Sequence, residues 1–317
     1  MIAATFLISA LVTGSWLWTP DKSLAQLQAK YLQSPTDMID VAGTRLHVRD
    51  SGPHTAPAVL LLHGFGSSLQ TWEPWAQMLD DEFRVVRLDL PGSGLSPPDP
   101  GGVYTDQRTI DVLVALLDRL NISKVDVIGN SIGGRIAWRF AVAHPERVER
   151  LVLISPDGFA SPGFDYGKPP AIPSVVGLMR YVLPKALLRM NLKPAYGNPD
   201  ALTEETVTRY HDLMLAPGSR AAVLERMRQS VLEKPEPLLQ TIHAPVLLVW
   251  GVKDAMIPIA NAADYTRNLP DSRLVTFPNL GHVPQEEAPA ESIVPVREFL
   301  EGAATAPTPG ERASHPG

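Results

Sequence analysis

Apolar runs of strand length alternate with longer amphipathic runs between residues 37 and 301. The strand-length runs lie at residues 58–62, 84–90, 124–129, 150–155, 245–251 and 273–278, after a pair at 38–41 and 45–49 that is typical of an opening hairpin. Most runs lack polar alternation, as expected of strands buried on both faces. Residues 106–120 have helical periodicity instead. The pattern predicts an α/β fold in which helices flank a mostly parallel sheet of eight strands.

The alternation is interrupted once, at residues 158–239. This stretch has no convincing strand, contains ten prolines and has helical segments near 174–183, 203–214 and 219–233. An insertion of this size usually lies over the sheet edge where ligands bind. We therefore expect a helical cap, residues 158–239, inserted after the sixth strand of a core formed by residues 37–157 and 240–301. The alternative is that these helices are ordinary layer helices of the sheet.

The two ends of the chain differ from its body. Residues 1–18 carry no charged side chain, and Pro20, Asp21 and Lys22 end this run. The length suits an export signal or a membrane anchor within residues 1–30, and a buried core helix is the alternative. The small residues around Ala25 would suit a signal peptidase. We therefore expect an exported or membrane-anchored protein, with membrane attachment through residues 2–18, and a disordered tail at residues 302–317.

Composition excludes several classes of function. The chain of 317 residues has 28 basic and 34 acidic side chains, a net charge of −6, and no basic block, which argues against nucleic acid as a partner. It has no cysteine, so disulfides, thiolate metal sites and a cysteine nucleophile are excluded.

Candidate chemistry begins with the sequence VIGNSIGG at residues 127–134. It contains Gly-x-Ser-x-Gly, with Gly129 and Gly133 on either side of Ser131, and it lies between an apolar strand and a helical run. In such a strand-to-helix turn the serine backbone is strained and its hydroxyl is exposed above the sheet. The following helix directs its positive end at the site. Ser131 is therefore the candidate nucleophile.

A serine nucleophile needs a base and a carboxylate that orients the base. Among eight histidines, His282 has the best setting, on a loop after the last strand. Asp254 follows the next-to-last strand and gives the chain order Ser131, Asp254, His282. Asp157, after the strand at 150–155, is the alternative acid. His63 is assigned to backbone positioning.

In these motifs the chain resembles the α/β-hydrolase family over residues 37–301. The matching segments are LLHGFGSS at 61–68, DLPGSGLS at 89–96, GNSIGG at 129–134, WGVKD at 250–254 and GHVPQEE at 281–287. The resemblance implies an oxyanion hole formed by the backbone N–H groups of Phe65 and Ile132. Dehalogenase and epoxide hydrolase relatives carry an aspartate where this chain has Ser131, so those reactions are disfavoured. No nucleotide or zinc motif occurs, and we expect no cofactor and no metal.

These residues predict a serine hydrolase that cleaves a small carboxylic ester, through an acyl-enzyme on Ser131. Apolar cap residues such as Met179, Met190, Met214 and Met227 suggest a pocket roof for an apolar acyl group, or simply the cap's own core. The first alternative is a carbon-carbon bond hydrolase of aromatic ring-fission products. Such enzymes resemble this chain but typically have Trp after the histidine, where this chain has Val283. A cofactor-free perhydrolase and a non-enzymatic scaffold are further alternatives.

Overall fold

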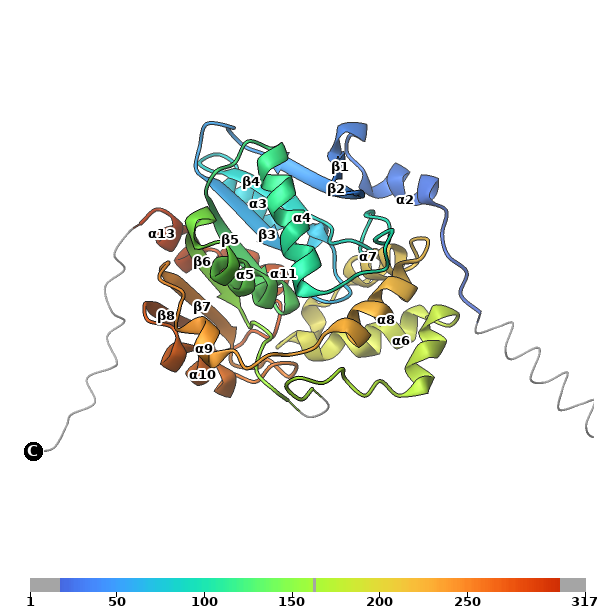
Figure 1. Ribbon diagram of the computed structural model, residues 1–317. Helices are drawn as coiled ribbons and strands as arrows, with labels where there is room; N and C mark the ends of the chain where they lie inside the picture. Colours follow the sequence, from blue (N-terminus) through green and yellow to red (C-terminus); the bar gives the residue numbers. More distant parts are fainter. Residues whose placement is uncertain (1–17, 162–163, 303–317) are drawn as a thin grey trace, which may run out of the picture.

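The computed structural model describes residues 18–161 and 164–302, and its centre is one sheet (Figure 1). The eight strands lie in the order β1, β2, β4, β3, β5, β6, β7, β8. Their bounds are β1 Met38–Val41, β2 Thr44–Ser51, β3 Ala58–Leu62, β4 Arg84–Leu88, β5 Val125–Asn130, β6 Val148–Ile154, β7 Val246–Gly251 and β8 Ser272–Phe277. β2 runs antiparallel to both β1 and β4, and all other neighbours are parallel. The predicted fold class is confirmed.

The strand order places a topological switch beside β3. The chain passes from β3 to β4 on one side and then returns to add β5 on the other side of β3. In open α/β sheets, ligands bind beyond the carboxyl ends of the strands at such a point. The loops after β3 and β5, which begin at His63 and Ser131, therefore meet where the topology favours a site.

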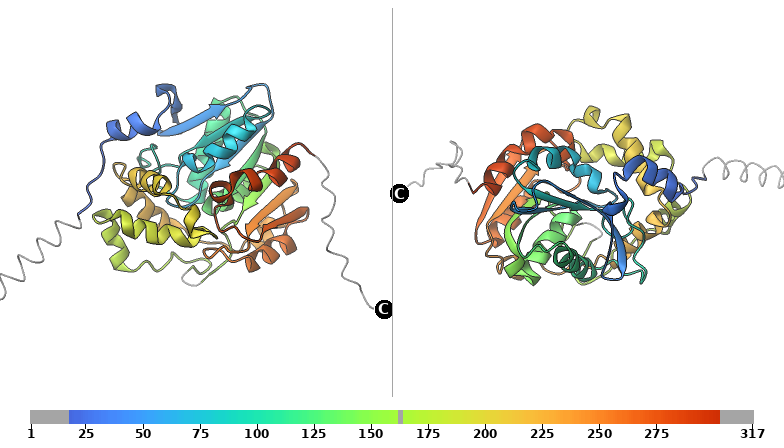
Figure 2. Two further views of the ribbon diagram at one scale, coloured as in Figure 1. Left: turned by 180° about the vertical axis from the view of Figure 1, so that it is seen from behind. Right: turned by 90° about the horizontal axis from the view of Figure 1, so that it is seen from above.

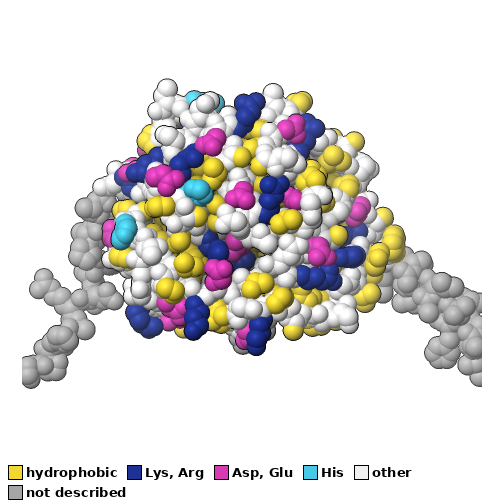
Figure 3. Space-filling view, in the orientation of Figure 1, with side chains coloured by type: hydrophobic (Ala, Val, Ile, Leu, Met, Phe, Trp, Pro, Cys, Tyr) yellow, Lys and Arg dark blue, Asp and Glu magenta, His cyan; other side chains and the backbone are white. Residues whose placement is uncertain are grey.

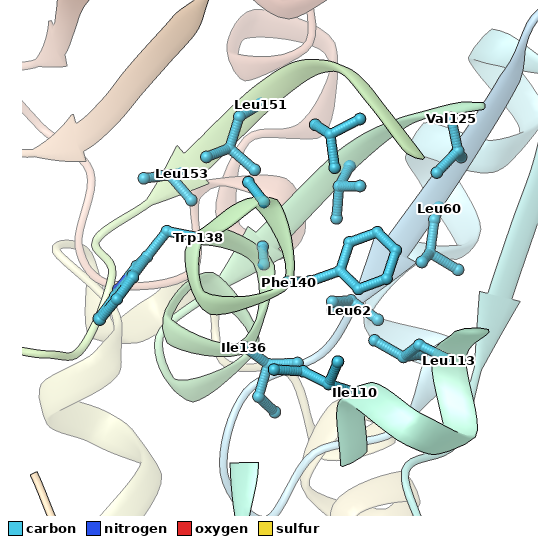
Figure 4. Packing of buried hydrophobic residues seen from close by; sticks show 14 of the residues in the cluster. Leu60, Leu62, Ile110, Leu113, Val125, Ile136, Trp138, Phe140, Leu151 and Leu153 are labelled. Atoms are coloured by element: carbon cyan, nitrogen blue, oxygen red, sulfur yellow. The ribbon is translucent and has the colours of Figure 1, made fainter. Parts of the chain in front are cut away.

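Helices cover both faces of the sheet, and each layer has its own apolar core (Figure 2). One face is covered by α4 (Asp106–Arg119), α5 (Ile132–Ala143), α9 (Glu236–Leu239) and α10 (Ala260–Asn268). The other is covered by α3 (Glu73–Leu79) and α13 (Val294–Leu300), with α11 (Pro284–Glu287) and α12 (Pro289–Ser292) leading into α13. Figure 4 shows Phe140 and Ile136 of α5 packed with β-strand leucines and with Ile110 and Leu113 of α4. This packing fixes the helix that begins directly after Ser131.

Between β6 and β7 the described residues form short helices. Before α9, these are the 3-10 helix η4 (Ser174–Arg180), α6 (Lys185–Leu192), the 3-10 turns η5 (Lys193–Ala195) and η6 (Pro199–Ala201), α7 (Glu204–Met214) and α8 (Ser219–Gln229). Residues 174–180 are therefore a 3-10 helix, and α6 is an element that the sequence pattern did not predict. Pro184 precedes the first residue of α6, and the proline-rich surroundings masked its periodicity. Buried cap side chains, including Leu183, Leu188 and Met214, form a small core of their own.

The chain before β1 is folded onto this body from residue 18 onward. Helix α2 (Leu24–Tyr31) begins at Ser23, whose side chain accepts a hydrogen bond from Gln26 N–H while Gln26 in turn accepts from Ser23 N–H. This reciprocal cap fixes the helix start, and Leu27 of the helix is buried. Residues 18–32, which we call the strap, therefore pack on the rest of the described structure, and the predicted signal or anchor within residues 1–30 stays a prediction.

The expected anchor and tail fall largely outside the described residues. The apolar stretch at 2–17 and residues 303–317 lie there, so their predicted roles stay predictions. Within residues 18–161 and 164–302, no helix is both long and apolar enough to cross a bilayer.

Candidate active site

Ser131 occupies the turn between β5 and α5. Its backbone has φ 57° and ψ −122°, a strained conformation for a residue with a side chain, and α5 begins at Ile132. The Ser131 N–H donates to Ile154 O, and its carbonyl accepts from the N–H groups of Arg135 and Asp157. These backbone hydrogen bonds hold Ser131 in its strained conformation and keep its side chain at the edge of the sheet.

The flanking glycines permit this turn because strand and helix nearly touch. A Cβ on Gly129 would lie 2.2 Å from Gly133 O, and a Cβ on Gly133 would lie 2.2 Å from Leu62 O. Both distances are far below van der Waals contact, so any side chain at either position would force the backbone apart. The Gly-x-Ser-x-Gly spacing is therefore a packing requirement of β3, β5 and α5.

His282 and Asp254 are brought together from two loops that are 28 positions apart in the chain. His282 Nδ1 lies 2.7 Å from Asp254 Oδ2, and the two side chains are 4% and 0% exposed. Asp254 Oδ1 accepts hydrogen bonds from the N–H groups of Met256 and Ile257. The carboxylate is thereby fixed in orientation, and its bond to Nδ1 leaves Nε2 as the nitrogen available for proton transfer.

The loop that carries His282 also touches the serine turn. Asn130, which directly precedes Ser131, donates from Nδ2 to His282 O at 2.9 Å and to Ile154 O at 3.2 Å. The histidine backbone is therefore held against the residue next to the candidate nucleophile. Asn130 was not singled out from the sequence, where an asparagine between Gly129 and Ser131 gives no signal of a bond to residue 282.

Asp157 lies near Ser131 but is not paired with His282. Its carboxylate accepts from Arg135 Nη1 at 2.5 Å, and Arg135 is buried. The same guanidinium contacts Asp106 at 3.1 Å. This ion cluster occupies the carboxylate of Asp157, so the geometry favours Asp254 as the partner of the imidazole.

The loop after β3 runs beside the serine turn. A Cβ on Gly64 would lie 3.3 Å from Ser131 Cβ, so this stretch of backbone passes directly over the candidate nucleophile. Among the described residues, the N–H of Phe65 has no hydrogen-bond partner. Ile132 is the first residue of α5, where N–H groups have no partner within the helix. Both N–H groups predicted for an oxyanion hole therefore flank Ser131.

His63 is buried and acts on the backbone of this loop. Nδ1 lies 2.8 Å from Gly64 O, and Nε2 accepts from Leu90 N–H at 3.0 Å. Burial lowers the pKa of His63, which keeps the ring neutral. A neutral ring protonated at Nδ1 satisfies both bonds, so His63 links the β3 loop to the β4 loop and is separate from the His282 pair.

Residues 57–289 match the sequence profile of the alpha/beta hydrolase fold family. The chain belongs to this family. Among its relatives, 2-hydroxy-6-oxononadienedioate/2-hydroxy-6-oxononatrienedioate hydrolase 2 of Pseudomonas putida is 33% identical over 254 residues, 77% of this chain and 87% of the relative. The 2-hydroxymuconate semialdehyde hydrolase of Pseudomonas sp. is 29% identical over 83% of this chain and 92% of its own length. A thermophilic esterase of Thermogutta terrifontis is 25% identical with a TM-score of 0.67, covering 84% of this chain and 97% of the esterase.

In this α/β-hydrolase, residues 281–287, which include His282, are hydrogen-bonded to residues 195–198 of the cap. His282 N–H donates to Ala195 O at 2.7 Å. The carboxylate of Glu287 accepts from the N–H groups of Gly281, Gly197 and Asn198 at 2.6–3.0 Å. A Cβ on Gly197 would lie 2.4 Å from Asn279 O, so the two backbones are in direct contact. The position of the imidazole therefore depends on residues 195–198 of the cap.

A second carboxylate, that of Glu286, connects the loop that carries His282 to the loop after β3. The Glu286 side chain is 6% exposed, pairs with Arg209 of α7 and accepts from Tyr196 Oη at 2.6 Å. Tyr210 Oη lies 3.3 Å from both Glu286 oxygens and accepts from Ser67 Oγ at 3.2 Å. Burial raises the pKa of Tyr210, which keeps its hydroxyl protonated. Helix α7 thus connects the loops that carry His282 and Phe65.

The cavity beside the loop after β3 is small. A cavity of about 10 Å³ lies between the β3 loop, the β4 loop and the cap helices. Its lining includes Gly66, Ser67, Gly94, Met214 and Val223. That volume holds about one water molecule.

Cap methionines do not all face this space. Met214 contributes to the cavity, whereas Met190 is 63% exposed and points to solvent. The predicted pocket roof therefore stays a prediction, and Met190 takes no part in the lining of this cavity. Within the described part of the chain, no group of three or more His, Asp or Glu side chains is arranged to hold a metal ion.

Proposed function

We propose that this α/β-hydrolase is a serine hydrolase of carboxylic esters, with Ser131 as nucleophile, His282 as general base and Asp254 as the acid that orients it. The observation that carries the proposal is the buried pair of His282 Nδ1 and Asp254 Oδ2, 2.7 Å apart, on a loop bonded to the residue before Ser131. A pair of this kind fixes the imidazole tautomer that can accept a serine proton.

The reaction follows from the positions of these groups. His282 Nε2 takes the Ser131 proton as Oγ attacks the ester carbonyl, and the N–H groups of Phe65 and Ile132 stabilise the oxyanion. One fixed donor of this type lowers the barrier by ~3–4 kcal/mol. The imidazolium then protonates the leaving alcohol, and water repeats the sequence on the acyl-enzyme. Asp254 stabilises the imidazolium throughout.

An apolar acyl group fits the surroundings of the oxyanion loop. Met214 and Val223 of the cap and Gly66 of the loop line the adjoining cavity. Methionine adapts to irregular apolar shapes, so this lining suits chains of different form. The esterase from Thermogutta terrifontis, which shares 25% identity and the fold, supports ester cleavage.

The second candidate is hydrolysis of a carbon-carbon bond in a ring-fission product. It is favoured by the 33% identity to the Pseudomonas putida hydrolase. Against it stands Val283, in the position after the histidine where such enzymes typically carry Trp. Val283 is buried in an apolar cluster with Ala195, Tyr196, Leu202 and Val207, so its environment is formed by the cap.

Turnover by wild type and by Ser131→Ala tests the proposal. Purified protein is assayed with a panel of p-nitrophenyl esters, with a ring-fission dienoate, and with an ester plus peroxide. We expect ester hydrolysis by wild type and a loss on the order of 10⁶ in the variant, because the three side chains act as a unit. A fluorophosphonate adduct should map to the peptide that contains Ser131.

Other results would contradict this assignment. Dienoate cleavage without ester turnover would replace ester hydrolysis with the carbon-carbon reaction. Retention of more than about one hundredth of wild-type ester turnover by folded Ser131→Ala would remove Ser131 from its role, since loss of a triad nucleophile costs far more.

A further inference from the structure

Exposed apolar side chains gather on one part of the surface. Among residues 18–161 and 164–302, fourteen large apolar residues are exposed. Six of them come from residue 18 and residues 175–190, and these six are 41–66% exposed. These six, which we call the cap patch, are Trp18, Val175, Leu178, Tyr181, Leu187 and Met190. Figure 3 shows apolar side chains at the edge of the molecule from which the N-terminal residues leave. Contiguous exposed apolar surface marks an interaction site more often than scattered single residues do.

Contacts within the cap patch hold it together. The rings of Trp18 and Tyr181 are stacked with centroids 5.6 Å apart, and Thr19 N–H donates to Tyr181 O. Leu187 and Met190 are three residues apart on α6 and therefore lie on one helix face. The opposite side of α6 packs inward through Leu188, so α6 presents its other face to solvent.

The charge of this region differs from that of the whole chain. Residues 166–199 contain five basic side chains and no acidic one, although the net charge of the chain is −6. Arg180, Lys185 and Arg189 pair with Glu225 or Glu204 of α8 and α7. Lys168 and Lys193 make no ion pair within the described residues. Basic side chains beside exposed apolar ones suit an anionic lipid surface.

The sequence that precedes Trp18 is uncharged and largely apolar, like the cap patch. Residues 1–17 carry no charged side chain, and the described structure begins at Trp18, which is a member of the patch. Tryptophan and tyrosine are the residues most enriched at the boundary between lipid and water. The apolar N-terminal sequence and the apolar cap surface therefore meet at one point.

The strap fixes this meeting point relative to the rest of the protein. Lys22 N–H donates to Leu215 O, and Asp21 pairs with Arg220 of α8 at 2.6 Å. Lys22 and Lys30 bind the buried carboxylate of Asp212 on α7, at 2.5 and 2.8 Å. Tyr31 bonds to the same carboxylate, while its carbonyl accepts from Arg49 of the core. The orientation of the cap patch is thus set by contacts on both cap and core.

We propose that the cap patch docks on an anionic lipid bilayer, so that the cap faces the membrane surface. Trp18 and Tyr181 lie at the headgroup level, and Leu178, Leu187 and Met190 contact the outer part of the acyl chains. The two basic residues of this region that are unpaired in the described part of the chain, Lys168 and Lys193, face the lipid phosphates. The docking concerns where the protein sits and does not depend on which bond it cleaves.

Site-specific probes test this docking, because the chain has no native cysteine. A single M190C substitution places an environment-sensitive fluorophore on the patch. V294C places the same fluorophore at an exposed apolar position on α13, at the opposite end of the molecule (Figure 1); Val294 is 51% exposed and Met190 63%. Each full-length variant is reconstituted into vesicles of phosphatidylglycerol and phosphatidylcholine that carry a nitroxide quencher near the headgroups.

We expect quenching at M190C to exceed that at V294C severalfold and to fall in vesicles of phosphatidylcholine alone. Equal quenching at the two positions would overturn the proposal. Shielding of the M190C fluorophore in detergent, together with a dimer mass by light scattering, would also overturn it and assign the patch to a second copy of the chain. Since the readout is fluorescence, failure of ester turnover would leave this result unaffected.

Discussion

Asp212 is the point where the strap is tied to the cap, and its replacement should cost a measurable part of the stability. Burial alone would raise the pKa of Asp212, but hydrogen bonds from Lys22, Lys30 and Tyr31 outweigh it and lower the pKa from 3.8 to about 2. One pKa unit corresponds to 1.36 kcal/mol. The ionised carboxylate therefore stabilises the folded state by about 2 kcal/mol at neutral pH.

The perturbation is Asp212→Asn, which keeps the size of the side chain and one acceptor oxygen. The free energy of unfolding at pH 7 should fall by about 2 kcal/mol, because Lys22 and Lys30 lose their anionic partner. Asp200→Asn is the matched control, since it removes one exposed cap carboxylate that has no ion pair, and it should change stability by less than about 0.5 kcal/mol. Urea unfolding followed by tryptophan fluorescence measures both variants.

The pH dependence gives the sign of the effect. A carboxylate with a lowered folded-state pKa stabilises the protein above its unfolded pKa, and this contribution is lost as pH falls through 3.8 toward 2. The difference between wild type and Asp212→Asn should therefore be constant above about pH 5 and shrink below it. A variant as stable as the Asp200→Asn control at pH 7, or a difference unchanged at pH 3, would refute the reasoning.

Three further predictions concern the core and the site. Burial raises the pKa of Asp126 to about 6 despite Arg150 nearby, so the folded protein loses stability as this carboxyl ionises on raising the pH through 6. In urea titrations, Asp126→Asn should therefore be about 2–3 kcal/mol more stable than wild type at pH 7 and equally stable below pH 4. Asp254→Asn should leave the fold intact by circular dichroism and lower kcat by about 10⁴, because an amide favours the wrong imidazole tautomer; an unchanged kcat would exclude Asp254 as the orienting group. Gly133→Ala should lower the free energy of unfolding by at least about 1–3 kcal/mol, since the new Cβ would lie 2.2 Å from Leu62 O. The control Gly177→Ala has open space around its Cβ and should leave the stability unchanged. Equal stability of the two variants in thermal unfolding would contradict the close approach at Gly133.

The sheet could be predicted from sequence because its signal is local. Most of the strands are short, mainly apolar runs, and all eight observed strands lie within two residues of their predicted bounds. Ser131 was identifiable because the same few residues that form the turn also reveal it. The partnership of Asp254 and His282 followed from their places after successive strands, since parallel strands end at one edge of the sheet.

Other features depend on pairs of residues that no local pattern connects. Asp212 is 190 positions from Lys22 and 182 from Lys30 in the chain, and each is an ordinary surface residue when read alone. In the sequence, Gly197 lies close to prolines and an asparagine, which suggest that the glycine is there for a turn. The structure gives another reason, because a Cβ at this position would lie 2.4 Å from Asn279 O. The helix α6 escaped prediction because it has only eight residues, buries a single side chain, that of Leu188, and follows Pro184.

The bonds between residues 195–198 and the loop at 281–287 have a consequence for protein engineering. Replacing the cap with that of another hydrolase, in order to change substrate range, would remove the acceptor for His282 N–H and two of the donors to Glu287. Such a chimera would carry all three reacting side chains and still misplace the imidazole. A successful transplant has to move both segments as one unit.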